Sequence, residues 1–370
     1  SEMCIRDSYQ GAGSSSVNAT RVDNLKDAAE ADDITLAGFC AGYERSGTPN
    51  PAFVEEAAAL ARKADVVVLC MGLDESSESE GLDRSHICIP ENQKQLLEAV
   101  AQANENLVVV LSAGSVVETG WVSRCKAVLH AYLGGQAGAG AMVDVLTGKV
   151  NPGGKLAETW ANAYEETPAR DNFAGAGRTV QYREGLYVGY RYYQTAGVPV
   201  AFPFGYGLSY TSYAYSDLKV TADSVTLTVT NTGARDGAEI VQVYVAKPDA
   251  KIFRPAQELK GFAKVFLNPV ESREVTIPLD DKAFRYWNVR TNHWEVEGGC
   301  YELRVGASCE DIRLRAVITV EGTVAPNPYE GKDLLHYQTA EVRKITDAEF
   351  ETLLGRPIPE SKIKIDRNMT

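Results

Sequence analysis

The sequence predicts an α/β domain with a mostly parallel sheet, followed by an all-β sandwich. Up to about residue 162, short apolar runs alternate with segments of helical periodicity, which is typical of a parallel sheet covered by helices. From Tyr213 to Gly322, β-branched runs with a period of two follow one another roughly every ten residues, separated by turn residues. This second pattern is typical of an antiparallel sandwich.

The elements of the first domain follow from local signals. The run ADVVVLCMG, residues 64–72, is apolar at nearly every position, as expected of a strand that helices cover on both faces. Asn50 before Pro51 is a typical N-cap and first helical residue. The expected strands are 34–39, 64–72, 107–114 and 127–133, and the expected helices are 51–63, 90–103 and 138–146. Parallel strands carry functional loops at their carboxyl ends, so we expect the site there.

The remainder of the chain shows two further features. Residues 182–210 are rich in aromatic rings and glycine, and they fit either a sugar-stacking surface or, as the more usual role, a buried core between domains. Residues 346–355 predict a short helix, with Thr346 and Glu349 forming a capping box and Gly355 as the C-cap. The first eight residues, SEMCIRDS, show no helical or strand pattern, and we interpret them as a non-native leader on an internal fragment.

Composition excludes several classes of function. The net charge of −13 argues against nucleic acid and anionic membranes as partners. The longest apolar run, residues 64–73, contains an Asp and is about half the length needed to cross a bilayer. Seven scattered cysteines include no Cys-x-x-Cys pair, so neither a zinc site nor a disulfide framework is expected, and a reducing, cytoplasmic setting fits better. We expect no metal and no cofactor.

The densest group of potential catalytic side chains follows the expected strand 64–72. The segment DESSESEGLDR holds five carboxylates and one arginine. Crowded carboxylates raise at least one pKa, which is what a general acid needs. The alternatives are a solvated acidic loop and a calcium loop, but the EF-hand pattern fails at Ser79 and Ser85. The charged residues are Asp74, Glu75, Glu78, Glu80, Asp83 and Arg84.

Other candidate motifs are weaker. GAGSSSVN, residues 11–18, lacks the Gly-Lys-Ser/Thr ending of a phosphate-binding loop, so a glycine-rich loop packed against a neighbouring domain is the better interpretation. No Gly-x-Ser-x-Gly elbow occurs, which leaves a serine hydrolase without support.

Five stretches together resemble glycoside hydrolase family 3, the β-glucosidase family. They are YQGAGSSSVN near the start, GLDESSESEGLDRSHICIPENQ, LGGQAGAGAMVDVLTGKVNPGGKLAETW, YREGLYVGYRYY and FPFGYGLSYT. The resemblance implies three parts: a catalytic (β/α)8 barrel, an α/β sandwich domain and a fibronectin type III-like, immunoglobulin-like β-sandwich. On this basis we expect the α/β sandwich with its aromatic connector at 9–212, the fibronectin-like sandwich at 213–322 and the start of a C-terminal extension at 323–370. The barrel is expected to be missing from the chain.

The resemblance also implies the chemistry. Family members are retaining glycosidases, which use one carboxylate as nucleophile and one as acid/base. The family's nucleophile is an Asp in a Ser-Asp-aromatic motif of the barrel, and Ser216-Asp217-Leu218 does not fit that motif. The acid/base falls on Glu80. Glu78, Asp83 and Arg84 are expected to position it, shape the loop and tune its pKa. Ser77 stands where many relatives have an aromatic residue.

The expected function is therefore that of a β-glucosidase-like exo-glycosidase that releases terminal β-linked glucose from an oligosaccharide or glycoside. Without the barrel, the chain is expected to be inactive alone, and a homo-oligomer is possible. Two alternatives stand beside this prediction: a β-xylosidase of the same family, and a non-catalytic carbohydrate-binding or adhesion module.

Overall fold

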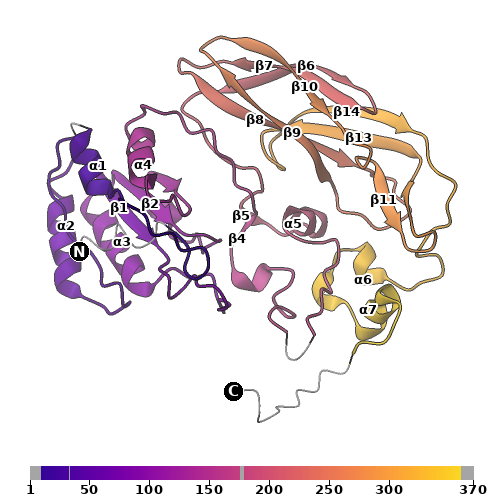
Figure 1. Ribbon diagram of the computed structural model, residues 1–370, viewed down its shortest axis with the longest axis horizontal. Helices are drawn as coiled ribbons and strands as arrows, with labels where there is room; N and C mark the ends of the chain where they lie inside the picture. Colours follow the sequence, from indigo (N-terminus) through magenta and orange to yellow (C-terminus); the bar gives the residue numbers. More distant parts are fainter. Residues whose placement is uncertain (1–9, 33, 176–178, 360–370) are drawn as a thin grey trace. The chain divides into compact units, whose positions relative to one another are not determined.

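The computed structural model describes residues 10–32, 34–175 and 179–359, so the interpretation of residues 1–8 as a leader lies outside the described part. The chain divides into two compact units (Figure 1). The first comprises residues 1–150 and 162–164, and the second comprises residues 151–161 and 165–370. No helix in the described ranges has the length and apolar character needed to span a membrane.

The first unit contains a three-stranded parallel sheet with the order β1-β2-β3. Helices α2 and α3 pack together, as do α1 and α4, and Figure 1 shows β1 and β2 between these two pairs. The strands are β1 (Val67–Gly72), β2 (Leu107–Ser112) and β3 (Ala127–His130), and the helices are α1 (Leu25–Ala31), α2 (Pro51–Ala61), α3 (Glu91–Ala103), the short η2 (Val122–Arg124) and α4 (Gly138–Leu146). The predicted parallel α/β layer is confirmed.

Burial explains why these segments form strands. Leu107, Val109 and Leu111 in β2 are fully buried, and Val110, which points to the other face, is almost so. A strand that is apolar on both faces is stable only where helices cover both. Asn50 caps α2 by accepting a hydrogen bond from the backbone N–H of Phe53, as predicted.

One strand prediction is wrong, and the other three strands are shorter than predicted, with β2 ending at Ser112 rather than at 114. Residues 34–39 form no strand: Ile34, Leu36 and Phe39 are each more than a third exposed, and the segment pairs with none of the described strands. An apolar run without a pairing partner gains no ladder of hydrogen bonds. β1 begins at Val67 rather than at 64, and β3 stops at His130 because the backbone turns into the left-handed region at Tyr132, with φ 50°.

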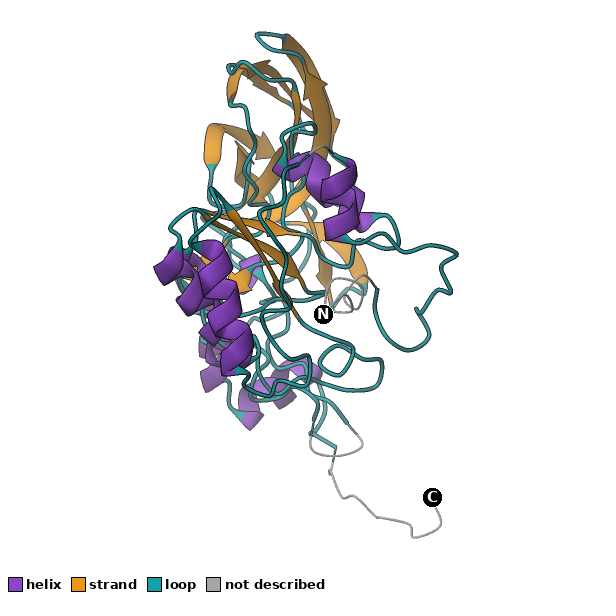
Figure 2. Cartoon of the chain, turned by 90° about the vertical axis from the view of Figure 1, so that its left-hand side faces the viewer, coloured by secondary structure: helices purple, strands orange, loops and turns teal. Residues whose placement is uncertain are grey.

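The second unit is built on antiparallel sheets (Figure 2). One sheet has the order β10-β7-β6, a second has the order β14-β13-β8-β9, and β11-β12 and β4-β5 are two-stranded ribbons. The strands are β4 (Trp160–Ala161), β5 (Val200–Phe202), β6 (Tyr213–Val220), β7 (Ser224–Asn231), β8 (Gly237–Ala246), β9 (Glu258–Leu267), β10 (Ser272–Pro278), β11 (Arg285–Asn288), β12 (His293–Val296), β13 (Gly299–Gly306) and β14 (Ile312–Val320). The helices are η3 (Tyr164–Glu166), α5 (Tyr190–Ala196), α6 (Leu335–Gln338), η4 (Val342–Lys344) and α7 (Asp347–Leu354).

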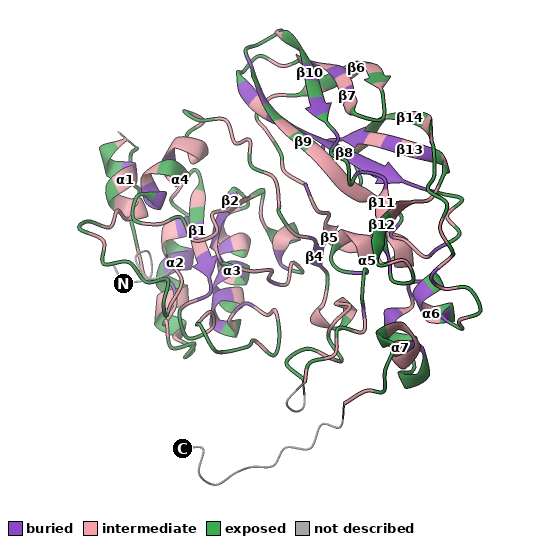
Figure 3. Ribbon diagram, turned by 45° about the vertical axis from the view of Figure 1, so that its right-hand side comes forward, coloured by how far each residue is buried: buried purple, intermediate pink, exposed green. Residues whose placement is uncertain are grey.

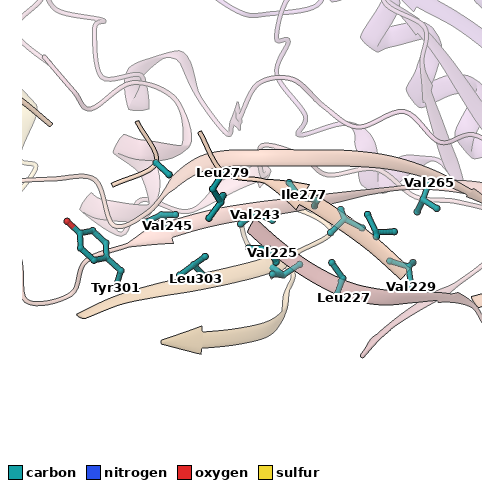
Figure 4. Close-up of a cluster of buried hydrophobic side chains, with 14 of the residues drawn as sticks. Val225, Leu227, Val229, Val243, Val245, Val265, Ile277, Leu279, Tyr301 and Leu303 are labelled. Carbon is teal, nitrogen blue, oxygen red and sulfur yellow. The ribbon is translucent and has the colours of Figure 1, made fainter. Parts of the chain in front are cut away.

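The core of this sandwich forms where the inner faces of its two larger sheets meet. Alternate residues of β7 are buried, and Val225, Leu227 and Val229 point into a cluster with Val243 of β8 and Leu303 of β13 (Figure 4). Figure 3 shows the buried positions along β8 and β13. The period of two read from the sequence is therefore the alternation between the core and solvent.

The aromatic segment packs against the C-terminal segment rather than lying open. Tyr187, Tyr192 and Tyr193 are buried in a second cluster with Tyr337 and Val342. The Tyr187 hydroxyl donates to the backbone carbonyl of Tyr337 at 2.5 Å. These rings thus form core, although Tyr182 in the same segment is largely exposed.

The helix predicted from its caps is present as α7. Thr346 and Glu349 form the reciprocal capping box, and Gly355 ends the helix in the left-handed conformation, with φ 73°.

Candidate active site

The acidic loop, residues 74–84, begins where β1 ends at the carboxyl edge of the parallel sheet. The buried side-chain amide of Gln93 in α3 fixes this strand end, because it accepts from the Gly72 N–H at 2.9 Å and donates to the Gly72 carbonyl at 3.0 Å. The Leu73 N–H then donates to the Ser112 carbonyl at the end of β2. The loop therefore starts from a rigid point beside the loop that follows β2.

Glu78 ties the acidic loop to the loop after β2. Its Oε2 accepts from the Gly114 N–H at 2.7 Å, and its Oε1 accepts from the Ser115 hydroxyl at 2.6 Å. Only 15% of the Glu78 side chain is exposed. Both carboxylate oxygens of Glu78 thus accept hydrogen bonds from the loop after β2.

Arg84 closes the same network from the other end of the loop. Its Nη1 donates to the Ser115 hydroxyl at 2.7 Å and to the Val116 carbonyl at 3.2 Å, and it lies 4.0 Å from Glu78 Oε1. Burial lowers the pKa of Arg84, which the charge of Glu78 partly offsets. Ser115, whose hydroxyl links Arg84 to Glu78, was not singled out from the sequence because it lies 31 residues beyond Arg84.

Glu80 lies between these two anchors and faces solvent. Its Oε2 accepts a 2.6 Å hydrogen bond from the Ser14 N–H, and residues Ala12 and Ser79 form an isolated β-bridge. The glycine-rich loop 11–18 therefore packs along the acidic loop of the same unit, and the expectation that it packs against a neighbouring domain stays a prediction. Gly13 adopts φ 90°, and a Cβ there would lie 2.6 Å from Glu80 Cβ.

The pKa of Glu80 corrects one part of the sequence-based argument. Crowded carboxylates were expected to raise this pKa, but hydrogen bonds from the Ser14 hydroxyl and backbone N–H lower it. No neighbouring carboxylate is among the causes that shift the pKa of Glu80. In the chain as described, Glu80 is a carboxylate held ionised by a neighbouring loop.

Asp74 and Glu75 interact with Arg45, at the base of the acidic loop. Burial acts to raise the pKa of Asp74, but hydrogen bonds from Ser76 and Ser77 and the charge of Arg45 outweigh it and lower this pKa. Asp83 is exposed. The structure therefore brings Glu78 and Arg84 together through Ser115, ties Glu80 to Ser14, and leaves Asp83 on the surface.

His130 is the titratable residue that sequence analysis did not single out. It ends β3 at the carboxyl edge of the sheet, where its ring contacts that of Tyr132 at a centroid distance of 3.7 Å. Burial lowers the pKa of His130 to about 4, against smaller opposing contributions from the Leu111 backbone and the charge of Glu78. His130 is therefore neutral at physiological pH. Its position at a strand end was the available signal.

No group of three or more His, Cys, Asp or Glu side chains in the described ranges is arranged to hold a metal ion. The chemistry that this site can support is that of one exposed carboxylate, supported by the network of Glu78, Ser115 and Arg84. A single carboxylate can exchange a proton with a bound group, whereas double displacement needs two carboxylates at a short spacing.

Comparisons with known proteins identify the family to which these two units are related. The sequence model of the glycosyl hydrolase family 3 C-terminal domain matches residues 3–210, and that of the fibronectin type III-like domain matches residues 239–309. The chain is 46% identical to the thermostable β-glucosidase B of Acetivibrio thermocellus over 85% of its own length and 43% of that protein. It is 44% identical to an exo-α-(1→6)-L-arabinopyranosidase of Bifidobacterium breve, over 86% of the chain and 43% of that protein.

Solved structures show the same relationship. The crystal structure of the family 3 β-glucosidase of Bifidobacterium adolescentis matches 92% of the chain and 54% of its own length, with 39% identity and a TM-score of 0.82. The chain thus spans about half or less of each relative. The α/β unit with its acidic loop, the fibronectin-like sandwich and these matches place the chain in glycosyl hydrolase family 3, whose members among its relatives include β-glucosidases.

Proposed function

We propose that this chain supplies the acid/base carboxylate, Glu80, of a retaining exo-β-glucosidase whose nucleophile lies on a (β/α)8 barrel. The observation that carries the proposal is the placement of Glu80: it is exposed at the carboxyl edge of the sheet, while Glu78 and Arg84 are tied to the loop after β2. The family relationship and the share of the relatives that the chain spans, 43%, support a further catalytic portion.

The mechanism assigns Glu80 two steps. As the barrel carboxylate attacks the anomeric carbon, Glu80 donates its proton to the glycosidic oxygen, and it then takes a proton from the water that releases the sugar. In retaining enzymes the two carboxyl groups lie about 5 to 5.5 Å apart. A second carboxylate at that distance, together with the exclusion of water, raises the pKa that Ser14 lowers in this chain.

The decisive experiment restores the catalytic portion. This chain replaces the matching region of the Acetivibrio β-glucosidase B, and the hybrid is assayed on cellobiose and on 2,4-dinitrophenyl β-glucoside. We expect Glu80→Gln to lower kcat/KM for cellobiose by about 10² to 10⁴, because that leaving group needs a proton. The loss on the dinitrophenyl substrate is expected to be smaller, and azide is expected to restore turnover by replacing the base-activated water.

The matched control is Glu75→Gln in the same loop, where the carboxylate pairs with Arg45. This variant is expected to keep the parent hybrid's activity. A hybrid in which Glu80→Gln leaves both substrates unaffected contradicts the assignment. The 370-residue chain alone is expected to be inactive, and turnover by it that Glu80→Gln abolishes would refute the need for a barrel.

The sugar released is a separate question. The relative from Bifidobacterium breve is named as acting on α-(1→6)-linked L-arabinopyranose, which favours an arabinopyranosidase as second candidate. The hybrid takes its remaining part from a β-glucosidase, so specificity is tested on the protein formed by this chain and its own catalytic portion. Nitrophenyl β-glucoside, β-xyloside and α-L-arabinopyranoside serve as the panel. Binding of sugars without hydrolysis of any of them would instead favour the carbohydrate-binding module.

A further inference from the structure

The second unit contains an open groove formed by the loop that joins β8 to β9. Residues 247–248 and 250–256 of this loop make most of its wall, and Arg304 of β13 and Gln338 of α6 complete it. Its volume is about 620 Å³, which is within the range of about 300 to 1,000 Å³ that ligand sites occupy. The groove is separate from the acidic loop of the first unit, and the proposed function makes no use of it.

The charge of this groove is opposite to that of the chain. Lys247, Lys251, Arg254 and Arg304 line it, and none of its lining residues is an Asp or Glu. The chain as a whole carries a net charge of −13. A concave surface lined by one sign of charge focuses the electrostatic field and attracts ions of the opposite sign. The groove therefore favours an anionic ligand.

The cationic side chains are held in place by neighbours outside the lining. Only 2% of the Lys247 side chain is exposed; its Nζ lies 4.8 Å from the centre of the Tyr301 ring and 3.1 Å from Asp249 Oδ1. Arg304 pairs with Glu302 at 2.6 Å and donates to Gln257 at 3.1 Å. Holding these side chains in advance reduces the entropy lost when a ligand binds.

Arg254 is held less completely. Its guanidinium lies 5.2 Å from the centre of the Tyr286 ring, and its Nη2 lies 3.3 Å from Glu297 Oε2. Even so, its Nε and Nη2 are buried and make no hydrogen bond with any described residue. Because these two nitrogens are shielded from solvent and Nη2 lies beside Glu297, Arg254 contributes to the groove through its charge rather than through these two atoms.

Lys251 and Asp249 differ from the other charged groups because both are exposed on the same loop. No salt bridge joins the Lys251 side chain to any described acid, so its ammonium is available to a ligand. Asp249 pairs with Lys247 and would compete with an incoming carboxylate for that ammonium. The two side chains should therefore affect an anionic ligand in opposite directions.

The walls between the charges are apolar. Pro248, Phe253 and Pro255 contribute to the lining, and Gln338 adds an amide at one end. Flat apolar surfaces pack against the C–H faces of sugar rings, whereas lysine and arginine pair with carboxylates. A ligand that alternates such faces with carboxylates matches both features, and a simple inorganic anion matches only the second.

We propose that the groove binds an acidic oligosaccharide, a chain of sugars that carries carboxylate groups. The test uses the 370-residue chain and isothermal titration calorimetry with trigalacturonate as the probe. Its methyl ester serves as the uncharged control, because esterification removes the charge and keeps the sugar rings. We expect trigalacturonate to bind, the ester to bind at least about tenfold more weakly, and added salt to weaken trigalacturonate binding.

Two variants that are expected to change the affinity for trigalacturonate in opposite directions test the groove directly. Lys251→Met is expected to weaken binding of trigalacturonate by about threefold to tenfold, and Asp249→Asn is expected to strengthen it by a similar factor. Lys282→Met, an exposed lysine that is not part of the groove, is the matched control and should leave binding unchanged. Circular dichroism checks that each variant is folded.

Three results would overturn the proposal. The first is the absence of trigalacturonate binding, or equal binding of its methyl ester. The second is a Lys251→Met variant with unchanged affinity, which would place any binding elsewhere. The third is displacement of trigalacturonate by inorganic phosphate at the same concentration, which would assign the groove to small anions instead of acidic sugars.

Discussion

Two glutamates in different units of the molecule have lowered pKa values for the same physical reason, yet their surroundings suggest opposite roles. Glu80 in the acidic loop faces solvent and is hydrogen-bonded by Ser14. Glu349 in α7 is buried; burial acts to raise its pKa, but hydrogen bonds from His336 and Thr346 outweigh it and lower the pKa to about 2. A lowered pKa alone therefore does not mark a functional carboxylate, and exposure separates the two.

The hydrogen bonds to Glu349 show what a structural carboxylate looks like. Its oxygens accept from the His336 and Thr346 backbone N–H groups at 2.9 and 3.0 Å, and from their side chains at 2.7 and 3.1 Å. This one side chain joins α6 to the start of α7. Glu80 makes its hydrogen bonds with a single neighbouring loop and stays exposed to solvent.

The largest expected effect is on stability, and it separates these two residues directly. Glu349→Gln is expected to lower the free energy of unfolding by about 1–3 kcal/mol, because charge-assisted hydrogen bonds are lost in a buried position. Glu80→Gln is expected to leave it nearly unchanged, as is usual for an exposed position. Urea unfolding of both variants measures the difference. Equal losses would show that exposure does not distinguish the two roles.

The dependence of stability on pH sharpens the same comparison. The pKa of Glu349 is about 2 in the folded chain and ordinarily 4.5, so its stabilisation is complete above pH 4.5 and is lost as the pH falls towards 2. His130 has a folded pKa of about 4 against 6.5, so the unfolded chain takes up its proton first and stability falls between pH 6.5 and 4. Glu349 and His130 therefore change the unfolding free energy over adjoining pH ranges.

Urea unfolding at a series of pH values tests these windows. Glu349→Gln should reduce the slope of the unfolding free energy against pH below pH 4.5, and His130→Gln should reduce that slope between pH 6.5 and 4. Each reduction corresponds to at most about one proton taken up on unfolding. The exposed Glu321→Gln serves as the control and should leave both windows unchanged. A His130→Gln variant that keeps the full slope above pH 4.5 would contradict the burial of this imidazole.

The contrast between Glu349 and Glu80 also shows how much could be predicted from the sequence. The capping box of α7 and its terminal glycine were predicted correctly because Thr346, Glu349 and Gly355 act within ten residues of one another. The hydrogen bond from Ser14 to Glu80 joins residues 66 apart, so no local pattern contains it. The same holds for Glu78 and Ser115, which lie 37 residues apart.

The strands also show that local patterns can be predicted from the sequence, whereas long-range pairing cannot. β7 and β8 fit the period-two runs expected between Tyr213 and Gly322, because most of their residues alternate between core and solvent or are buried. β9 fits that pattern less well, because Gly261 interrupts it and much of it is only half-buried, so pairing with β8 stabilises it more than its own pattern does. The run 34–39 shows the opposite error, an apolar pattern without a partner strand. Long-range pairing is therefore what sequence analysis lacked.

A smaller effect is expected where the glycine-rich loop contacts Glu80. Gly13→Ala adds a Cβ 2.6 Å from Glu80 Cβ at a residue with φ 90°, so it should cost about 1–2 kcal/mol and displace the Glu80 side chain. Gly47→Ala is the matched control, because Gly47 has φ 80° and no atom within 4 Å of its added Cβ. Urea unfolding gives the cost of each. Equal losses of unfolding free energy in the two variants would mean that the loop moves to accommodate the added Cβ without displacing Glu80.

The smallest effect concerns the pKa of Glu80 itself. Ser14→Ala removes the hydroxyl bond, which is the larger of the two contributions from Ser14, and leaves the backbone N–H at 2.6 Å. The pKa of Glu80 should therefore rise, and ¹³C NMR titration of the side-chain carboxyl measures the change. In a restored enzyme the same change should move the alkaline limb of the pH profile upward, because the general acid then keeps its proton to higher pH. Ser16→Ala, in the same loop, is the control for general loosening. A rise of equal size in that variant would mean that loop order, rather than the Ser14 hydroxyl, sets the ionisation of Glu80.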